Sequence, residues 1–264
     1  MTSPSGAKLE ILADPEALSL RVAAWLLELA IAKQSTFAVC LSGGSTPQRF
    51  YEYLAEPPYR GAFPWSRTHW FWGDERFVPH DDTLSNYRMV REALLARAPI
   101  PAVNIHPIPT EGLSPEMAAS AYERELKTFY GADRLDPARP LFDVTFLGLG
   151  PDGHTASLFP GNAVLAERDK WVAAVVGAQP EARVTLTYPT LESSRHSAFL
   201  VAGEEKRTIF KRLRLGDDSL PAARLRPIGT LWLFGDTAAG EVCVPKTSHG
   251  DFRVKGRKES LVHE

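Results

Sequence analysis

This sequence of 264 residues has few cysteines, no large excess of one charge and no long apolar run. Its two cysteines, Cys40 and Cys243, are far apart and lie in apolar runs, which excludes a disulfide framework or a zinc knuckle and predicts small buried side chains. The 30 basic and 32 acidic residues give a formal net charge of −2, which argues against nucleic-acid binding as the main role. Any anion recognition must therefore be local.

A membrane segment and a secretion signal are also missing. No run approaches the roughly 18 consecutive apolar residues that cross a bilayer. The opening residues MTSPSGAKLE lack the charged-then-apolar order of a signal peptide. We therefore expect a cytoplasmic protein without a membrane partner. No histidines have the spacing of metal ligands, so we predict no metal.

Helical and strand-like patterns alternate along the chain, which has enough hydrophobic residues (44%) for a substantial core. Asp14, Pro15 and Glu16 are typical of a capped helix start. Further helices are expected from residue 47 and at 87–97, 115–130 and 204–213, with strands at 36–41, 70–72, 142–147, 171–176, 184–187, 198–202 and 230–234. Such alternation indicates an α/β fold with a mostly parallel sheet flanked by helices. We expect one domain over residues 1–264, with a loosely held polar tail at 246–264.

The first loop that could carry chemistry is Ser42-Gly43-Gly44-Ser45-Thr46-Pro47, between an expected strand and an expected helix. Two glycines let the backbone approach a ligand, and the N–H groups of the helix start favour an anion. The lysine and spacing of a P-loop are missing. The loop is therefore either a phosphate cradle or a Gly-Ser turn with a helix cap.

The second loop is Gly73-Asp74-Glu75-Arg76, which follows an aromatic strand and precedes Ser85 and Asn86. An acidic pair with an arginine at a strand end can position water or bind an anionic or polyhydroxylated substrate. The alternative is a solvated charged turn.

The third loop is Gly148-Leu149-Gly150-Pro151-Asp152-Gly153, which fits the dinucleotide spacing G-x-G-x-x-G. That fingerprint should open a long helix and be followed by a strand ending in an acid. Here Pro160 and Gly161 interrupt the chain too early, and no acid follows. What remains is Asp152 next to His154, a pair that suits hydrolysis or proton transfer. The alternative is a structural histidine that caps a short helix.

Two cationic residues complete the candidates. Arg183 opens a strand-like run, and Lys206 lies where a strand end enters a helix. A lysine at a helix N-terminus opposes the helix dipole, and a bound anion would offset that cost. Each is otherwise a surface charge.

Together these segments resemble the 6-phosphogluconolactonase family, in order from about residue 10 to about residue 240. The resemblance implies hydrolysis of 6-phospho-D-glucono-1,5-lactone on a modified Rossmann-like fold without a bound dinucleotide or other cofactor. It implies that His154 is the general base with Asp152 beside it, and that Arg76 contacts the substrate or the oxyanion. The implied residues for binding the sugar phosphate are Ser42, Gly43, Gly44, Ser45, Asp74, Asn86, Arg183 and Lys206.

Two other functions compete with this interpretation. Glucosamine-6-phosphate deaminases share the D-G-H loop but continue as F-N-E-P, whereas this sequence reads Ser157-Leu158-Phe159-Pro160. The deaminases also typically carry an aromatic residue where Arg76 follows the acidic pair. A non-catalytic sugar-phosphate sensor is the second alternative, although no helix-turn-helix segment accompanies the domain. For the oligomeric state, we favour a monomer.

Overall fold

The computed structural model of the chain describes residues 6–240, so the predictions for Cys243 and for the tail 246–264 lie outside the described residues. The cap at the first helix forms as expected, because Asp14 Oδ1 accepts the Ala17 N–H at 2.8 Å and α1 (Pro15–Ala32) starts with proline. Cys40 is fully buried.

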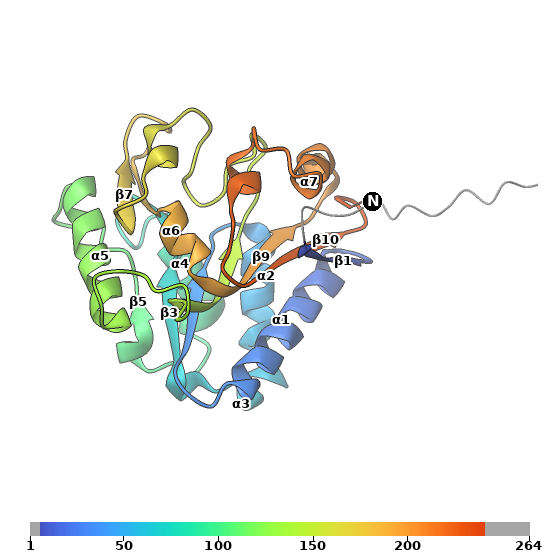
Figure 1. The fold of residues 1–264 in the computed structure, drawn as a ribbon. Coiled ribbons are helices and arrows are strands. Elements are labelled where there is room, and N and C mark those ends of the chain that lie inside the picture. Colours follow the sequence, from blue (N-terminus) through green and yellow to red (C-terminus); the bar gives the residue numbers. More distant parts are fainter. Residues whose placement is uncertain (1–5, 241–264) are drawn as a thin grey trace, which may run out of the picture.

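The main sheet has seven strands in the order β1-β10-β9-β6-β2-β3-β5, and every pair of neighbours is parallel (Figure 1). The expected α/β fold with a mostly parallel sheet is confirmed. The strands are β1 (Lys8–Leu12), β2 (Phe37–Leu41), β3 (Thr68–Trp72), β5 (Ile105–His106), β6 (Phe142–Leu147), β9 (Ser194–Val201) and β10 (Thr230–Asp236).

A second, three-stranded antiparallel sheet has the order β4-β8-β7. It consists of β4 (Asp74–Arg76), β7 (Val172–Val175) and β8 (Arg183–Leu186). The sequence predicted β7 and β8 but treated residues 73–76 as a loop. The structure differs because the acid-rich segment Asp74–Arg76 pairs with Thr185–Arg183, although its composition disfavours a strand.

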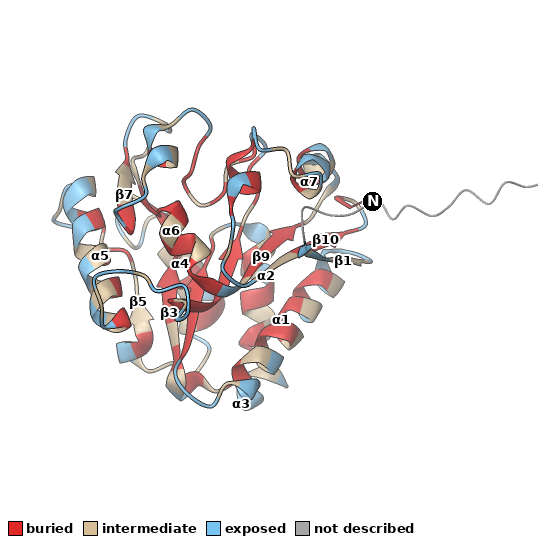
Figure 2. Cartoon of the chain, viewed as in Figure 1, coloured by how far each residue is buried: buried red, intermediate tan, exposed pale blue. Residues whose placement is uncertain are grey.

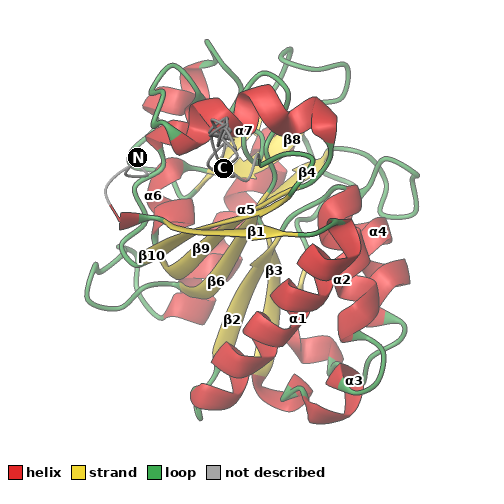
Figure 3. Ribbon diagram, turned by 90° about the vertical axis from the view of Figure 1, so that its right-hand side faces the viewer, coloured by secondary structure: helices red, strands yellow, loops and turns green. Residues whose placement is uncertain are grey.

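Helices cover both faces of the main sheet (Figure 3). The consecutive residues Trp70 and Phe71 of β3 illustrate this, because neighbours on a strand point to opposite faces. Trp70 packs against Phe63 and Trp65, which follow α3, whereas Phe71 packs against Phe129 of α5. The helices are α2 (Ser45–Leu54), α3 (Tyr59–Ala62), α4 (Asn86–Val90, continued by a π-helical turn over Arg91–Leu95), α5 (Pro115–Tyr130), α6 (Tyr188–Glu192) and α7 (Arg207–Arg214).

Most strand residues of the main sheet are buried between these layers (Figure 2). β2 and β6 are buried over their whole length, as expected for central strands of a parallel sheet covered on both faces. Two strands of the main sheet that the sequence did not predict, β1 and β5, lie at its edges. Edge strands are only partly buried, so their sequences do not show the continuous apolar run that identifies the central strands.

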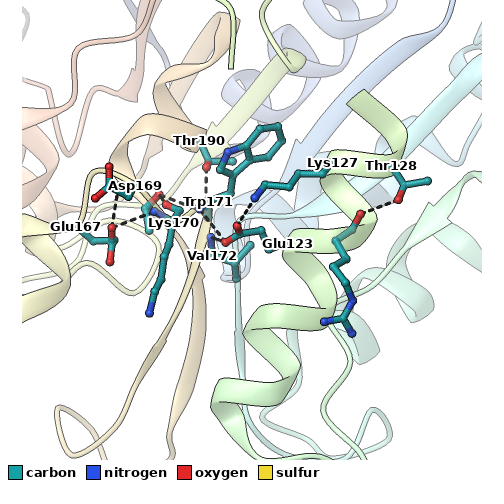
Figure 4. Close-up of polar contacts among 11 residues, drawn as sticks. Glu123, Lys127, Thr128, Glu167, Asp169, Lys170, Trp171, Val172 and Thr190 are labelled. Carbon is teal, nitrogen blue, oxygen red and sulfur yellow. Dashed lines mark hydrogen bonds and ion pairs between the residues drawn. The ribbon is translucent and has the colours of Figure 1, made fainter. Parts of the chain in front are cut away.

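Helix α5 also ties the second sheet to the body of the protein (Figure 4). Glu123 Oε2 accepts the backbone N–H groups of Trp171 and Val172 at 3.0 and 3.3 Å, and Oε1 accepts Lys127 Nζ at 2.6 Å. The carboxylate thereby satisfies backbone donors at the start of β7.

The order of strands reverses between β2 and β6. From β2 the chain proceeds to β3 and β5, and it then returns to place β6 on the other side of β2. Loops that leave the carboxyl ends of strands at such a switch point diverge and form a crevice. The loops starting at Ser42 and Gly148 therefore border the same crevice.

Candidate active site

A cavity of about 550 Å³ lies at this switch point. Every residue that the resemblance assigned to the site lines it, from six separate segments of the chain: Ser42, Gly43, Gly44, Ser45, Asp74, Arg76, Asn86, Asp152, His154, Arg183 and Lys206. A larger hollow of about 1030 Å³ lies between α5 and β7 and contains none of them. Size alone would therefore have pointed to a hollow that contains none of the candidate residues.

The loop after β2 is held by a buried tyrosine. Tyr51 of α2 accepts the Ser42 N–H at 3.0 Å and donates its hydroxyl to the Ser42 carbonyl at 2.9 Å. Gly44 has φ 108°, a conformation that favours glycine, and no side chain caps the start of α2. Gly44 is itself the N-cap of α2, so the turn does begin a helix, and its role as a phosphate cradle stays a prediction. Ser45 and Thr46, the first residues of α2, line the cavity, and the N–H groups of a helix start favour an anion.

The loop after β6 presents a histidine and a carboxylate. His154 Nδ1 lies 2.5 Å from Asp152 Oδ1, and the same oxygen accepts the His154 backbone N–H at 3.1 Å. Partial burial acts to raise the pKa of Asp152, but the hydrogen bonds from His154 outweigh it and lower that pKa below its ordinary value. An ionised carboxylate only accepts, so Nδ1 is the donor in this contact, and in the neutral imidazole Nε2 is then the acceptor.

Local backbone geometry explains this placement. The Gly150 N–H donates to the His154 carbonyl at 2.9 Å, and Gly153 turns the chain with φ 84°. A Cβ on residue 150 would lie 2.1 Å from His154 Nδ1, so the imidazole packs directly on the glycine. Phe159 closes the other side, with its ring centroid 4.7 Å from that of His154. The residues after His154 form turns rather than the short helix of the alternative interpretation.

Two arginines stand side by side where the second sheet meets the cavity. Arg76 of β4 and Arg183 of β8 are direct partners across the antiparallel ladder. Burial, followed by the neighbouring Arg76 charge, lowers the pKa of Arg183. Within the described residues, the buried Arg183 Nε has no hydrogen-bond partner, and Glu181 is 3.9 Å from the guanidinium. Two adjacent cations with an unsatisfied donor favour an anion.

The acidic pair of the second loop is divided by the strand. Asp74 lines the cavity and accepts the Ser157 hydroxyl at 2.7 Å, which connects the loops after β3 and β6. Glu75 is 1% exposed and does not line the cavity. The interpretation of both acids as groups that face water or substrate is therefore wrong for Glu75, because alternate strand residues point to opposite sides.

Lys206 lies in a 3-10 turn (Glu204–Lys206) at the start of α7. Its Nζ donates to the Leu149 carbonyl at 2.8 Å, which brings it over the loop that carries His154. Sequence reasoning did not identify Gln179, which lines the cavity from the β7–β8 connection, because a glutamine in a polar loop carries no distinguishing pattern.

Other kinds of site were also searched in the described part of the chain. Across residues 6–240, no three His, Cys, Asp or Glu side chains gather as metal ligands would. Over the same range, no helix has both the length and the apolar character to cross a membrane.

Fold and cavity define a parallel α/β protein with clustered cations beside a histidine–carboxylate pair. Comparison with known proteins identifies the family: the model described as glucosamine-6-phosphate isomerases/6-phosphogluconolactonase matches residues 13–233. The chain belongs to this family, as the resemblance predicted.

Three similar proteins of this family are named 6-phosphogluconolactonase. A 6-phosphogluconolactonase from Nostoc sp. is 39% identical, covering 89% of this chain and 98% of its own, and one from Rattus norvegicus is 36% identical, covering 94% and 99%. The structure of 6-phosphogluconolactonase from Thermotoga maritima superposes with a TM-score of 0.73 at 35% identity, covering 87% and 99%. The sequence-based assignment as a 6-phosphogluconolactonase enzyme is confirmed at this level.

Proposed function

We propose that the protein hydrolyses 6-phospho-D-glucono-1,5-lactone to 6-phospho-D-gluconate, the second step of the oxidative pentose phosphate pathway. The observation that carries the proposal is the His154–Asp152 pair in the same cavity as Arg76, Arg183 and Lys206. The substrate needs both features, since a phosphate must be bound and an ester carbonyl must be attacked by water.

The proposed chemistry starts at His154. Asp152 holds the proton on Nδ1, so Nε2 removes a proton from water, and the resulting hydroxide attacks C1 of the lactone. Asp152 also stabilises the imidazolium that forms. The bond between C1 and the ring oxygen then breaks, and the imidazolium returns its proton to that oxygen. A lactone is an activated ester, so the reaction requires no covalent nucleophile.

We assign the remaining cavity residues to the two ends of the substrate, the charged phosphate and the neutral lactone. The loop Ser42–Ser45, Arg183 and Lys206 would bind the phosphate through backbone N–H groups and two cations. Arg76 would contact the substrate or stabilise the oxyanion that develops on the carbonyl oxygen. Asp74 and Asn86 would bind sugar hydroxyls or hold the arginine.

Phe159 disfavours the deaminase alternative. Its ring packs on His154 and carries no group that can exchange a proton, whereas the deaminase motif places a glutamate there. The sensor alternative leaves the Asp152–His154 pair without a role.

A coupled assay tests the proposal. Glucose-6-phosphate dehydrogenase generates the lactone, and its disappearance is followed with and without the protein. We expect clear acceleration over spontaneous hydrolysis and no ammonia from glucosamine 6-phosphate. Ammonia release without lactone hydrolysis would contradict the proposal.

The proposal includes the setting expected from the sequence, a monomer acting in the cytoplasm on a small-molecule substrate. Light scattering coupled to gel filtration and fractionation of the source cells test these two points. A stable dimer, or recovery in another compartment, would contradict them.

A further inference from the structure

Glu75 is a buried acid with no assigned role in the reaction. Its neighbours Asp74 and Arg76 line the cavity, whereas Glu75 points to the other side of β4 and is 1% exposed. A buried carboxylate is costly unless hydrogen bonds compensate for the lost water. The groups that Glu75 binds therefore indicate what it stabilises.

Four donors surround the carboxylate. Oε1 accepts the backbone N–H groups of Arg76 and Asn86 at 2.8 and 2.7 Å. Oε2 accepts the Tyr87 N–H at 2.7 Å and the Ser85 hydroxyl at 3.2 Å. Burial raises the pKa of Glu75 while the backbone hydrogen bonds oppose that rise. One carboxylate thus joins the β4 backbone to the beginning of α4.

Asn86 transmits this restraint to the cavity. Its Nδ2 donates to the Asp74 carbonyl at 2.9 Å, and its Oδ1 accepts Arg76 Nη1 at 2.6 Å. A Cβ on Gly43 would lie 2.0 Å from the same Oδ1, so the backbone of the loop after β2 packs directly against the Asn86 amide. The position of Asn86 therefore sets the distance between the Arg76 guanidinium and the loop after β2.

We propose that Glu75 is a positioning residue for the phosphorylated substrate. It acts through Asn86 and holds Arg76 and the loop after β2 at a fixed separation. The part that concerns the lactone rests on the function proposed above. The positioning itself concerns anion binding and can be measured without turnover.

The test is Glu75→Gln, which keeps the shape but replaces one acceptor oxygen by an NH2 group, which donates hydrogen bonds and cannot accept one. We expect KM for the lactone to rise about tenfold, the size of one hydrogen bond involving a charged group. We expect kcat to fall by a smaller factor than KM rises, because only the Arg76 side of the site is displaced while His154 and Asp152 lie on a different loop.

Glu123→Gln is the matched control. Glu123 also accepts two backbone N–H groups at a strand start, and it lies outside the catalytic cavity (Figure 4). We expect this variant to lower the thermal midpoint while KM stays at the wild-type value. A KM within about twofold of wild type in Glu75→Gln, or an equal rise in both variants, overturns the proposal.

A double-mutant cycle with Asn86→Ala tests the route through Asn86. If Glu75 acts through that amide, adding Glu75→Gln to the Asn86→Ala variant should raise KM by less than about twofold over Asn86→Ala alone. Multiplicative effects contradict this route. If Glu75→Gln does not fold, Glu75→Asp replaces it in the same measurements, because the shorter carboxylate cannot reach both β4 and the start of α4, and an unchanged KM overturns the proposal.

Binding of inorganic phosphate, measured by calorimetry, separates this inference from the proposed function. Weaker phosphate binding in Glu75→Gln than in Glu123→Gln supports positioning even if wild-type protein does not hydrolyse the lactone. Normal phosphate binding and normal KM in an active Glu75→Gln enzyme overturn positioning and leave the lactonase function intact.

Discussion

Charged side chains near the two ends of the main sheet differ in whether they have partners within the protein. At the amino end, Asp143 is 3% exposed and accepts both Lys33 Nζ at 2.7 Å and the Ala38 N–H at 2.8 Å, with Arg195 at 3.4 Å. At the carboxyl end, the adjacent Arg76 and Arg183 face a cavity, and Arg183 Nε has no partner in the described part of the chain.

This difference separates stability from function. The charges at the amino end satisfy one another and hold strands together, so their removal should change folding. The charges at the carboxyl end leave bonding capacity unused, which a substrate with an anionic group can complete. If this comparison is right, substitutions at the two ends should affect different measured quantities.

The largest effect is expected for His154→Ala. Removing the base should lower kcat by a factor of about 10² to 10⁴, with a modest change in KM and a thermal midpoint lowered by no more than about 3 °C. Steady-state assays on the folded variant measure this. Unchanged turnover would remove His154 from the proposed mechanism.

Asp143→Ala is the counterpart at the amino end. It removes the acceptor for Ala38 and leaves Lys33 without its partner. We expect a loss of about 2 kcal/mol in the free energy of unfolding, below the range for fully buried pairs because Lys33 is 33% exposed. Urea unfolding measures the loss, and kcat and KM should match wild type at a temperature where the variant is folded. A changed KM would break the separation of the two ends.

How much of this the sequence could predict differs between the same two regions. The cavity residues were predictable because glycines, hydroxyls and charges interrupt apolar runs at strand ends, and parallel strands bring these ends together. The partner of Asp143 could not be predicted, since Lys33 is 110 positions away in sequence and a lysine after a helix has no distinctive pattern.

The separate roles of Asp74 and Glu75 show a second limit. Neighbouring acids after a strand look alike in sequence, and only the pairing of β4 with β8 decides which one faces the cavity. That pairing depends on contacts between residues about a hundred positions apart, which local propensity does not encode. Strands β1 and β5 were missed for a related reason, because edge strands are only partly buried.

A pair of tyrosines allows a finer test. Tyr51 bridges the N–H and carbonyl of Ser42 at the cavity, whereas Tyr130 accepts the Asp136 N–H at 2.8 Å and donates to the Arg139 carbonyl at 2.7 Å in a loop outside it. Replacing either by phenylalanine should cost about 1 kcal/mol of stability. Only Tyr51→Phe should weaken phosphate binding, by about threefold. Equal phosphate affinities in both variants would show that the hydroxyl does not shape the loop.

The smallest effect concerns the stability contribution of Asp152. Its pKa is lowered in the folded protein, so its contribution is present above the unfolded pKa near 4 and is lost as pH falls through the folded value. Because the side chain is 44% exposed, solvent screening should keep the contribution below about 1 kcal/mol. Urea unfolding of wild type and Asp152→Asn should therefore differ most near pH 7 and converge as the pH falls below about 4. A gap that widens as the pH falls would mean that the carboxylate does not stabilise the fold, although it stands in the loop that holds His154.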